Sequence, residues 1–389
     1  MIIKHAKIYG EEQVDLRIKD GKIIEIGSIL QSDDCDVLDL QGKTLLPSFI
    51  DLNVSLCDDS FSVDNLCYLE KSCLQGGVGT IVLRDSLLDA NTQFYMLYFD
   101  KLKSFKITIL PTIKVVNNEG KLKDISILLD NGAKGLEIQS SLGSNLLRQS
   151  MQYASMKNSI VFLKCFDENF DDHGVMNDGK TSFELGLIGI SDIAEISEVA
   201  KMKQIAQFYK NKASFDCLGI KKSFEILKDD FSEISIHHLI KSENACENFN
   251  TQAKILPPLR AKEELDDLQK MLKNQEISFL SSLHSPKTNK NLAFDEAGFG
   301  IDSIKSYASL CFTYFIDNKI LNWRELCDLT SFNQAKFLGL NKGKIEVGYD
   351  ADLIIFDENI SAKGEGLYKN DTLKGEVRKH LINGEVFSF

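Results

Sequence analysis

The chain has 389 residues, 43% of them hydrophobic and 26% charged, so it can bury one large core and a smaller one, as soluble globular proteins do. Its net charge of −12 argues against a nucleic-acid-binding protein, which needs basic side chains for the phosphates. No apolar run approaches about 18 residues and no signal-peptide core is present, so we expect no membrane span. The nine cysteines, an odd number without a Cys-x-x-Cys pair, indicate reduced thiols and a cytoplasmic protein.

Both ends of the chain carry short alternating segments that are typical of β-strands. Residues 14–27 contain two such segments joined by a hairpin turn, and residues 351–357 repeat the pattern near the C-terminus. Because both ends differ from the middle of the chain, we predict one small β-sandwich domain built from residues 1–46 and 342–389.

A buried strand follows over residues 45–56, which are mostly apolar. In its second half, Asp51, Asn53 and Ser55 alternate with apolar residues, and this spacing places the three polar side chains on one face. A polar face at the C-terminal end of a buried strand is where a barrel enzyme carries its chemistry.

Seven further apolar strands alternate with helical patterns along the middle of the chain. They lie at residues 79–84, 105–110, 135–138, 159–164, 213–218, 233–237 and 277–282. Eight strands alternating with helices predict an α/β fold, a (β/α)₈ TIM-type barrel over residues 47–341.

Ordered motifs along the chain resemble the amidohydrolase superfamily, and its dihydroorotase branch in particular. They are Leu46-Pro47-Ser48-Phe49-Ile50-Asp51, His173-Gly174-Val175-Met176-Asn177-Asp178-Gly179, Pro257-Pro258-Leu259-Arg260, Phe294-Asp295-Glu296-Ala297-Gly298-Phe299-Gly300 and Gly348-Tyr349-Asp350-Ala351-Asp352-Leu353. The resemblance spans nearly the whole chain, and it implies a metal-dependent enzyme of pyrimidine biosynthesis that hydrolyses a cyclic amide.

The resemblance also implies a ligand set for one or two Zn²⁺ at the C-terminal ends of the strands. It consists of a His-x-His on the first strand, an Asp or modified Lys at the fourth, His residues after the fifth and sixth, and an Asp on the eighth that acts as general base. Such a metal lowers the pKa of a bound water and polarises a carbonyl.

The sequence departs from this ligand set at every position that we can align. Asn53 and Ser55 replace the His-x-His, Lys164 stands at the fifth-strand ligand and Gly219 at the sixth. Leu283 replaces the general base, and a Leu side chain can neither ligate a metal nor move a proton. We therefore expect no metal, no cofactor and no catalytic residue, which makes the chain a pseudoenzyme.

Further positions agree with this expectation or leave an alternative open. Cys57 stands where the resemblance implies an Arg that clamps the substrate carboxylate, Leu256 where it implies an Asn, and residues 138–140 offer no clear carboxylate. Cys57, Cys165 and Cys217 lie near three strand ends, so a zinc-binding thiolate cluster stays open as an alternative.

Few of the six histidines lie near a strand end. His237 and His238 point to opposite faces of a strand, so they cannot both ligate one ion in regular geometry, and the resemblance implies a structural role for the pair. His284 follows the eighth strand and is expected to be a hydrogen-bonded remnant rather than a base. Asp171 and Asp172 indicate a solvated loop.

Lys164 carries a hypothesis of its own. A Lys inside the barrel mouth needs acidic partners, because an unpaired buried charge is costly. Its ammonium would replace the missing metal charge and hold Asp51, Asp167 or Asp216. The alternative is a solvated Lys at a strand end.

A small anionic ligand at the barrel mouth is a further possibility that we retain. Lys164, Lys287 and Arg260 would offer it positive charge, and His284, Phe299 and Gly300 are further candidates for contact.

The resemblance implies a role for a chain that keeps this fold without its chemistry. Inactive homologues of this group assemble with aspartate transcarbamoylase and support its quaternary structure. We therefore expect an oligomeric, structural or regulatory partner of that enzyme. The alternative is an active or divergent dihydroorotase or cyclic amidohydrolase with a rebuilt site.

Overall fold

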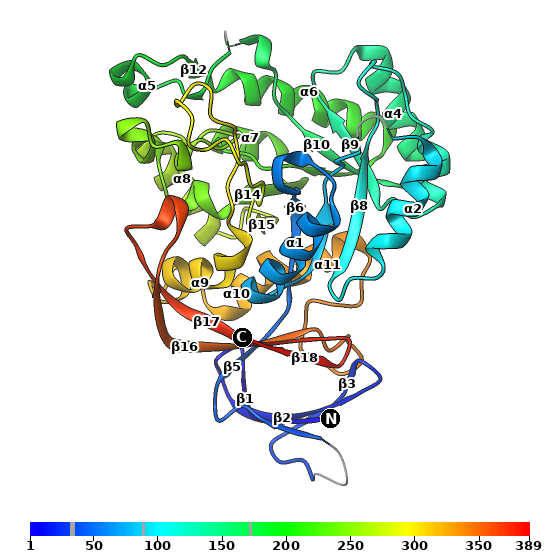
Figure 1. Cartoon of the computed structure of the whole chain (residues 1–389), viewed down its shortest axis with the longest axis vertical. Coiled ribbons are helices and arrows are strands. Elements are labelled where there is room, and N and C mark those ends of the chain that lie inside the picture. Colours follow the sequence, from blue (N-terminus) through cyan, green and yellow to red (C-terminus); the bar gives the residue numbers. More distant parts are fainter. Residues whose placement is uncertain (32–35, 88–89, 171–172) are drawn as a thin grey trace.

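The computed structural model describes residues 1–31, 36–87, 90–170 and 173–389, and its two parts are a barrel and a sheet to which both ends of the chain contribute (Figure 1). The predicted solvated loop at Asp171 and Asp172 lies outside these residues. In the part of the chain that is described, no helix is long and apolar enough to cross a membrane.

Eight parallel strands form the barrel, in the same order as along the chain. They are β6 (Phe49–Val54), β7 (Val78–Leu83), β8 (Thr108–Lys114), β9 (Gly135–Gln139), β10 (Ile160–Lys164), β13 (Lys212–Phe215), β14 (Phe231–Ser235) and β15 (Phe279–Ser281). A parallel bridge between Val54 and His284 links the two outer strands, so the barrel is nearly closed. The predicted (β/α)₈ architecture is confirmed.

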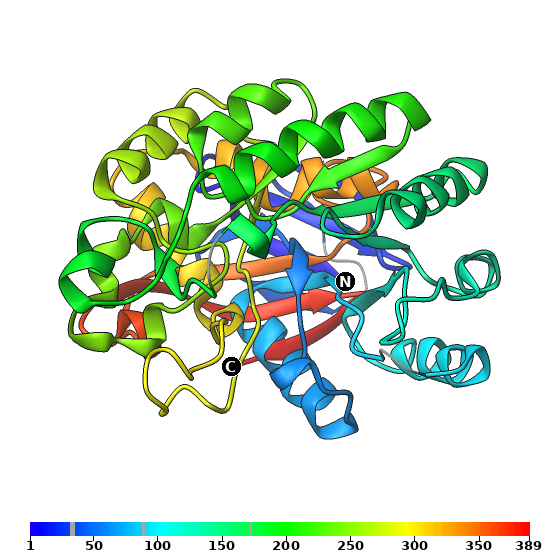
Figure 2. The ribbon, with the colours of Figure 1, turned by 90° about the horizontal axis from the view of Figure 1, so that it is seen from above.

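The helices surround the strands on the outside of the barrel (Figure 2). They are α1 (Val63–Gly76), α2 (Thr92–Leu102), α3 (Ile125–Asp130), α4 (Ser144–Met156), α5 (Lys180–Leu185), α6 (Ile193–Tyr209), α7 (Lys221–Leu227), α8 (Lys262–Lys273), α9 (Tyr307–Cys311), α10 (Trp323–Cys327) and α11 (Asn333–Leu338). The short strands β11 (Met176–Asn177) and β12 (Gly189–Ile190) pair with each other in the connection between β10 and β13.

The strands of the two chain ends form one mixed sheet. Its members are β1 (Ile2–Ile8), β2 (Gln13–Lys19), β3 (Lys22–Gly27), β4 (Val37–Asp39), β5 (Thr44–Pro47), β16 (Leu353–Lys363), β17 (Thr372–Ile382) and β18 (Glu385–Ser388). The two ends meet where β5 pairs with β16 in antiparallel register. The small β domain formed by both termini is thereby confirmed.

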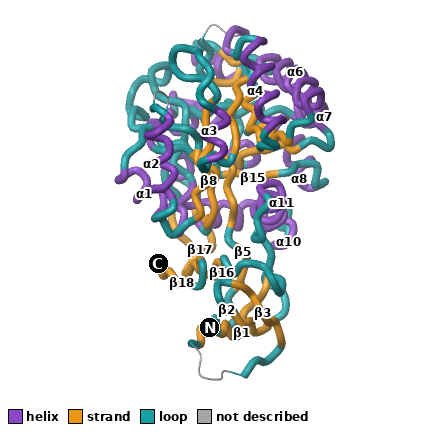
Figure 3. Tube along the Cα trace, turned by 90° about the vertical axis from the view of Figure 1, so that its right-hand side faces the viewer, coloured by secondary structure: helices purple, strands orange, loops and turns teal. Residues whose placement is uncertain are grey.

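The terminal sheet packs against the N-terminal ends of the barrel strands (Figure 3). His380 of β17 is fully buried at this contact, with Nε2 2.7 Å from Ser48 Oγ and Nδ1 3.1 Å from the carbonyl oxygen of Leu74. Burial lowers the pKa of His380 to about 4, so the imidazole is neutral at pH 7. The C-terminal ends of the strands therefore lie on the side of the barrel away from the sheet.

Strand β8 lies further along the chain than the sequence pattern predicts. The pattern predicts this strand at residues 105–110, before Pro111. The structure continues the strand to Lys114, and the carbonyl of Pro111 accepts a hydrogen bond of 2.7 Å from the backbone of Lys134. The shift brings Lys114 to the C-terminal end of the barrel.

A candidate site at the barrel mouth

The C-terminal ends of the barrel strands surround a cavity of about 500 Å³. This volume lies within the range of small-molecule sites, about 300–1,000 Å³. Its charged and polar wall includes Asn53, Ser55, Asp59, Arg84, Asp85, Lys114, Glu137, Gln139, Lys164, Glu195, Asp216 and Lys287. The cavity occupies the place where a barrel enzyme carries its chemistry.

Arg84, directly after β7, supplies the central positive charge of the site. Its Nη2 atom lies 2.8 Å from Asp216 Oδ2, and the two side chains are 9% and 11% exposed. The guanidinium also lies over the ring of Phe162, 4.7 Å from the centroid. Burial opposes the charge, but attraction by Asp216, Glu137 and Glu233 keeps the pKa of Arg84 above its ordinary value.

Glu233 on β14 is a fully buried acid of the barrel interior. Its Oε1 atom accepts hydrogen bonds from Asn53 Nδ2 at 3.0 Å and from Ser281 Oγ at 2.6 Å, while Oε2 has no partner. Burial and the nearby charge of Asp216 raise the pKa of Glu233 to about 8. Burial raises the pKa of Asp216 to about 6, against the attraction of Arg84.

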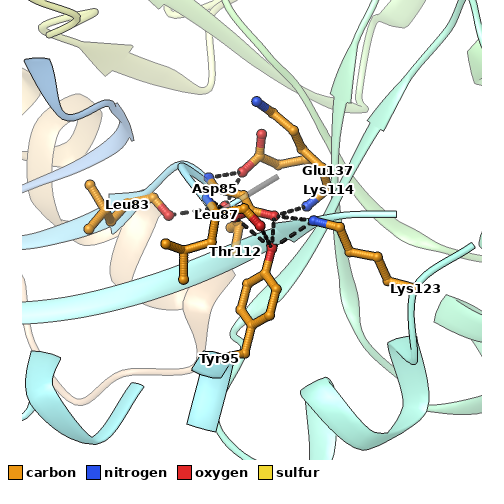
Figure 4. A network of polar contacts seen from close by, with 8 residues as sticks. All are labelled: Leu83, Asp85, Leu87, Tyr95, Thr112, Lys114, Lys123 and Glu137. Carbon is orange, nitrogen blue, oxygen red and sulfur yellow. Dashed lines mark hydrogen bonds and ion pairs between the residues drawn. The ribbon is translucent and has the colours of Figure 1, made fainter. Parts of the chain in front are cut away.

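A second network fixes the segments that follow β7 and β8 (Figure 4). Asp85 accepts hydrogen bonds from Lys123 Nζ at 2.9 Å, from the Tyr95 hydroxyl at 2.8 Å and from the backbone of Lys114 at 2.9 Å. The backbone N–H of Asp85 in turn donates to Glu137 at 2.6 Å. The network therefore holds Lys114 and Glu137 in place at the cavity wall.

The ammonium of Lys164 is attracted by the charges of Asp59, Glu137 and Asp216, but Asp216 is not held by Lys164 alone. In the described part of the chain, no carboxylate forms an ion pair with its ammonium, although the side chain lines the cavity. Asp216 pairs with Arg84 instead, and Asp51 is bound to the backbone of Asn53 at 2.9 Å and of Ser282 at 2.8 Å. Burial, followed by repulsion from Lys114, lowers the pKa of Lys164.

The positions aligned with metal ligands carry no suitable donors. Ser55 uses its backbone N–H to bind the carbonyl of His284 at 2.7 Å, and the backbone N–H of Gly219 donates to Glu195 at 3.0 Å. Leu283 contributes only an apolar side chain to the cavity wall. Within residues 1–31, 36–87, 90–170 and 173–389, no three His, Cys, Asp or Glu side chains come together as a metal site would require. The residues present do not fit a zinc site.

The cysteine alternative receives no support from the geometry. Cys165 and Cys217 line the cavity, but Cys57 is absent from its wall. Burial raises the pKa of all three thiols, which keeps them protonated at neutral pH, whereas a metal needs thiolates.

The structure separates the candidate ligand contacts into two groups. Lys164, Lys287, Phe299 and Gly300 all line the cavity. Arg260 and His284 do not. The guanidinium of Arg260 is buried against Asn177, Ile190 and Asp192, with Nη1 3.0 Å from Asp192 Oδ1.

The histidines at this end of the barrel are embedded in hydrogen bonds. Nδ1 of His284 accepts from the backbone of Ser303 and Ile304, both at 3.3 Å. His237 Nε2 lies 2.9 Å from the carbonyl of Ser282, and His238 Nδ1 lies 2.7 Å from Ser235 Oγ. Burial lowers the pKa of His284 to about 4, so it is neutral at pH 7.

Sequence reasoning missed four charged residues of the site: Arg84, Lys114, Glu137 and Glu233. Glu137 lies one position before the segment that we examined for a carboxylate, and Lys114 lies beyond the predicted end of its strand. An ionisable residue inside an apolar strand was the available signal, because such a charge needs a partner inside the barrel.

Comparison with known proteins agrees with this architecture. The Amidohydrolase family model matches residues 181–387. The chain is 30% identical to a dihydroorotase of Ruminiclostridium cellulolyticum, covering 89% of this chain and 85% of the relative. It is 29% identical to a probable dihydroorotase-like protein of Helicobacter pylori, covering 99% and 97%. In three dimensions it resembles the L-hydantoinase (dihydropyrimidinase) from Arthrobacter aurescens, with a TM-score of 0.84 at 18% identity, covering 100% of this chain and 95% of that one.

Proposed function

The chain belongs to the amidohydrolase family and is dihydroorotase-like in sequence, and from this premise we propose that it is a non-catalytic member of the family. Its role is that of a structural or regulatory partner of aspartate transcarbamoylase in pyrimidine biosynthesis. The protein keeps the barrel and the terminal sheet and presents them as a surface for assembly.

The observation that supports the proposal is the buried ion pair between Arg84 and Asp216. It places a fixed guanidinium at the strand ends, where hydrolases of this fold need a Lewis acid. Two ammonium groups, those of Lys114 and Lys164, line the same cavity and add repulsion toward a divalent cation. The positive charges of Arg84, Lys114 and Lys164 therefore disfavour the binding of Zn²⁺, since no imidazole ligands stand at the aligned positions to offset them.

The position aligned with the general base supports the proposal as well. Hydrolysis of a cyclic amide needs a group that removes a proton from water, and Leu283 at the aligned position has none. Selection on such a chain would then act on its surface and fold rather than on a reacting centre.

Co-purification from the native cell tests the assembly role. The full chain, tagged at one end, should carry aspartate transcarbamoylase with it, and deleting the chain should lower that enzyme's activity or change its oligomeric size. The control is a tagged Gly76→Ala chain, whose fold should be disrupted because the new methyl would lie 1.8 Å from the carbonyl oxygen of Ile304. It shows whether capture of the enzyme needs the folded chain. Absence of the enzyme from the pull-down, with full activity in the deletion strain, would refute the role.

One observation favours a second candidate, a divergent hydrolase with a rebuilt site. Asp216 lines the cavity, and its pKa near 6 is suited to proton transfer at neutral pH. Turnover of dihydroorotate or another cyclic amide that is lost in Asp216→Asn would establish this candidate, whereas no turnover by the unsubstituted chain would remove it.

A further inference from the structure

Two lysines face the barrel mouth from neighbouring parts of its wall. Lys114 is the last residue of β8 and Lys164 the last residue of β10, and both line the cavity. Lys114 is in register with Glu137 on β9, which is in register with Phe162 on β10. Lys164 follows two residues after Phe162, so it points to the same side of the sheet one level nearer the mouth.

Most other charges of the cavity wall already have a partner of opposite sign. Arg84 pairs with Asp216, Lys287 with Asp59 at 2.6 Å, Asp85 with Lys123 and Glu195 with Arg260 at 4.0 Å.

Lys114 and Lys164 differ from these groups. Within the described ranges, neither ammonium has a carboxylate within ion-pair distance. Asp59, Glu137 and Asp216 attract the Lys164 ammonium, but Asp59 is already paired with Lys287 and Asp216 with Arg84. The carboxylate of Glu137 accepts hydrogen bonds from Thr112 and from the backbone of Asp85. Because these three acids are already engaged, the two ammonium groups leave positive charge facing the cavity. A ligand that supplies negative charge there relieves the repulsion between the lysines.

We propose that the cavity binds a small organic carboxylate, with its negative charge between the ammonium groups of Lys114 and Lys164. Phe166 and Phe299 line the same cavity and offer apolar contact to the hydrocarbon part of the ligand, and Gln139 offers an amide. These aromatic walls favour an organic acid over an inorganic oxyanion. The site requires neither a metal nor a general base, so it is independent of the assembly role proposed above.

Isothermal titration calorimetry on the full chain tests the proposal with three probes. Succinate carries two carboxylates, succinamide is its neutral diamide, and inorganic phosphate is an anion without a hydrocarbon part. We expect saturable binding of succinate, no binding of succinamide and weaker binding of phosphate. Added NaCl should weaken the binding of succinate, because salt screens charge attraction.

Substitutions assign the binding to the two lysines. Lys164→Met and Lys114→Met should each weaken the binding of succinate at least about tenfold, which corresponds to about 1.4 kcal/mol. The matched control is Lys121→Met, on the segment that follows β8. Its ammonium is exposed and paired with Glu119 at 2.7 Å, away from the cavity, so affinity should not change. Circular dichroism checks that each variant folds. If Lys164→Met does not fold, Lys164→Gln takes its place.

Three results would overturn the proposal: no binding of succinate, equal binding of succinamide, or binding that survives both lysine substitutions. Binding of phosphate alone would also contradict it, because the organic part would then contribute nothing. Succinate binding without hydrolytic turnover leaves the assembly role intact, whereas failure to bind leaves the co-purification result unaffected. The two proposals can therefore fail separately.

Discussion

Replacing Arg84 by Met should destabilise the barrel strongly and in a pH-dependent way. The substitution removes the 2.8 Å ion pair to Asp216 and the contact over Phe162, and it leaves a carboxylate in a site that is only 11% exposed. Breaking a buried pair in this way costs about 3–5 kcal/mol. In the variant, Asp216 escapes part of this cost by taking up a proton, because the attraction of Arg84, the largest effect that opposes burial, is lost.

The sign of the pH dependence follows from linkage. A carboxyl whose pKa is higher in the folded than in the unfolded chain binds more protons when folded, so stability falls as pH rises between the two values. The loss caused by Arg84→Met should therefore be larger at about pH 8 than at about pH 5. Urea unfolding followed by circular dichroism measures both losses.

Two controls make the experiment decisive. Arg84→Met combined with Asp216→Asn removes the uncompensated charge and should recover part of the lost stability. Arg148→Met removes an Arg from the surface of α4, where it donates hydrogen bonds to Asn145 and Gln152, and should cost less than about 0.5 kcal/mol. The reasoning is refuted if Arg84→Met costs no more than Arg148→Met, or if the double variant is no more stable than the single one.

Three further predictions concern other parts of the fold. Glu233→Gln should flatten the decline in stability between about pH 5 and about pH 8, because the raised pKa of Glu233 makes the folded state lose stability as pH rises through this window; an unchanged slope in urea unfolding would contradict this. Gly76→Ala places a methyl 1.8 Å from the carbonyl oxygen of Ile304, so it should cost about 3 kcal/mol or prevent folding, and a variant with unchanged Tm would refute the close approach. Lys123→Met leaves Asp85 buried without its cation and should cost about 3 kcal/mol; a cost below about 1 kcal/mol would show that the remaining donors suffice.

The barrel and the terminal sheet could be predicted because both rest on local patterns. Apolar runs separated by helical periodicity define the eight strands, and alternating segments at both chain ends define the small sheet. The end of β8 could not be predicted from such a local pattern. Its continuation past Pro111 depends on the backbone of Lys134, which donates a hydrogen bond to the carbonyl of Pro111.

The charge pairing inside the barrel was not predictable from the sequence. Which acid meets which base depends on the register between strands and on the level that each side chain reaches. Arg84 follows β7 and reaches Asp216 after β13 across the interior, so Asp216 forms its ion pair with Arg84 rather than with Lys164 at the neighbouring strand end. The alignment with metal ligands named Asn53, Ser55, Gly219 and Leu283 but gave no reason to consider Arg84.

Metal content, measured together with turnover, tests the central claim most directly. The full chain is purified without chelator from cells grown with added zinc, and its zinc content is determined by mass spectrometry alongside an assay with dihydroorotate and carbamoyl aspartate. Because the strand ends carry Arg84 and Lys164 in place of imidazole ligands, we predict less than about 0.1 equivalent of zinc and no turnover. About one or two equivalents of zinc with turnover of dihydroorotate would contradict the account.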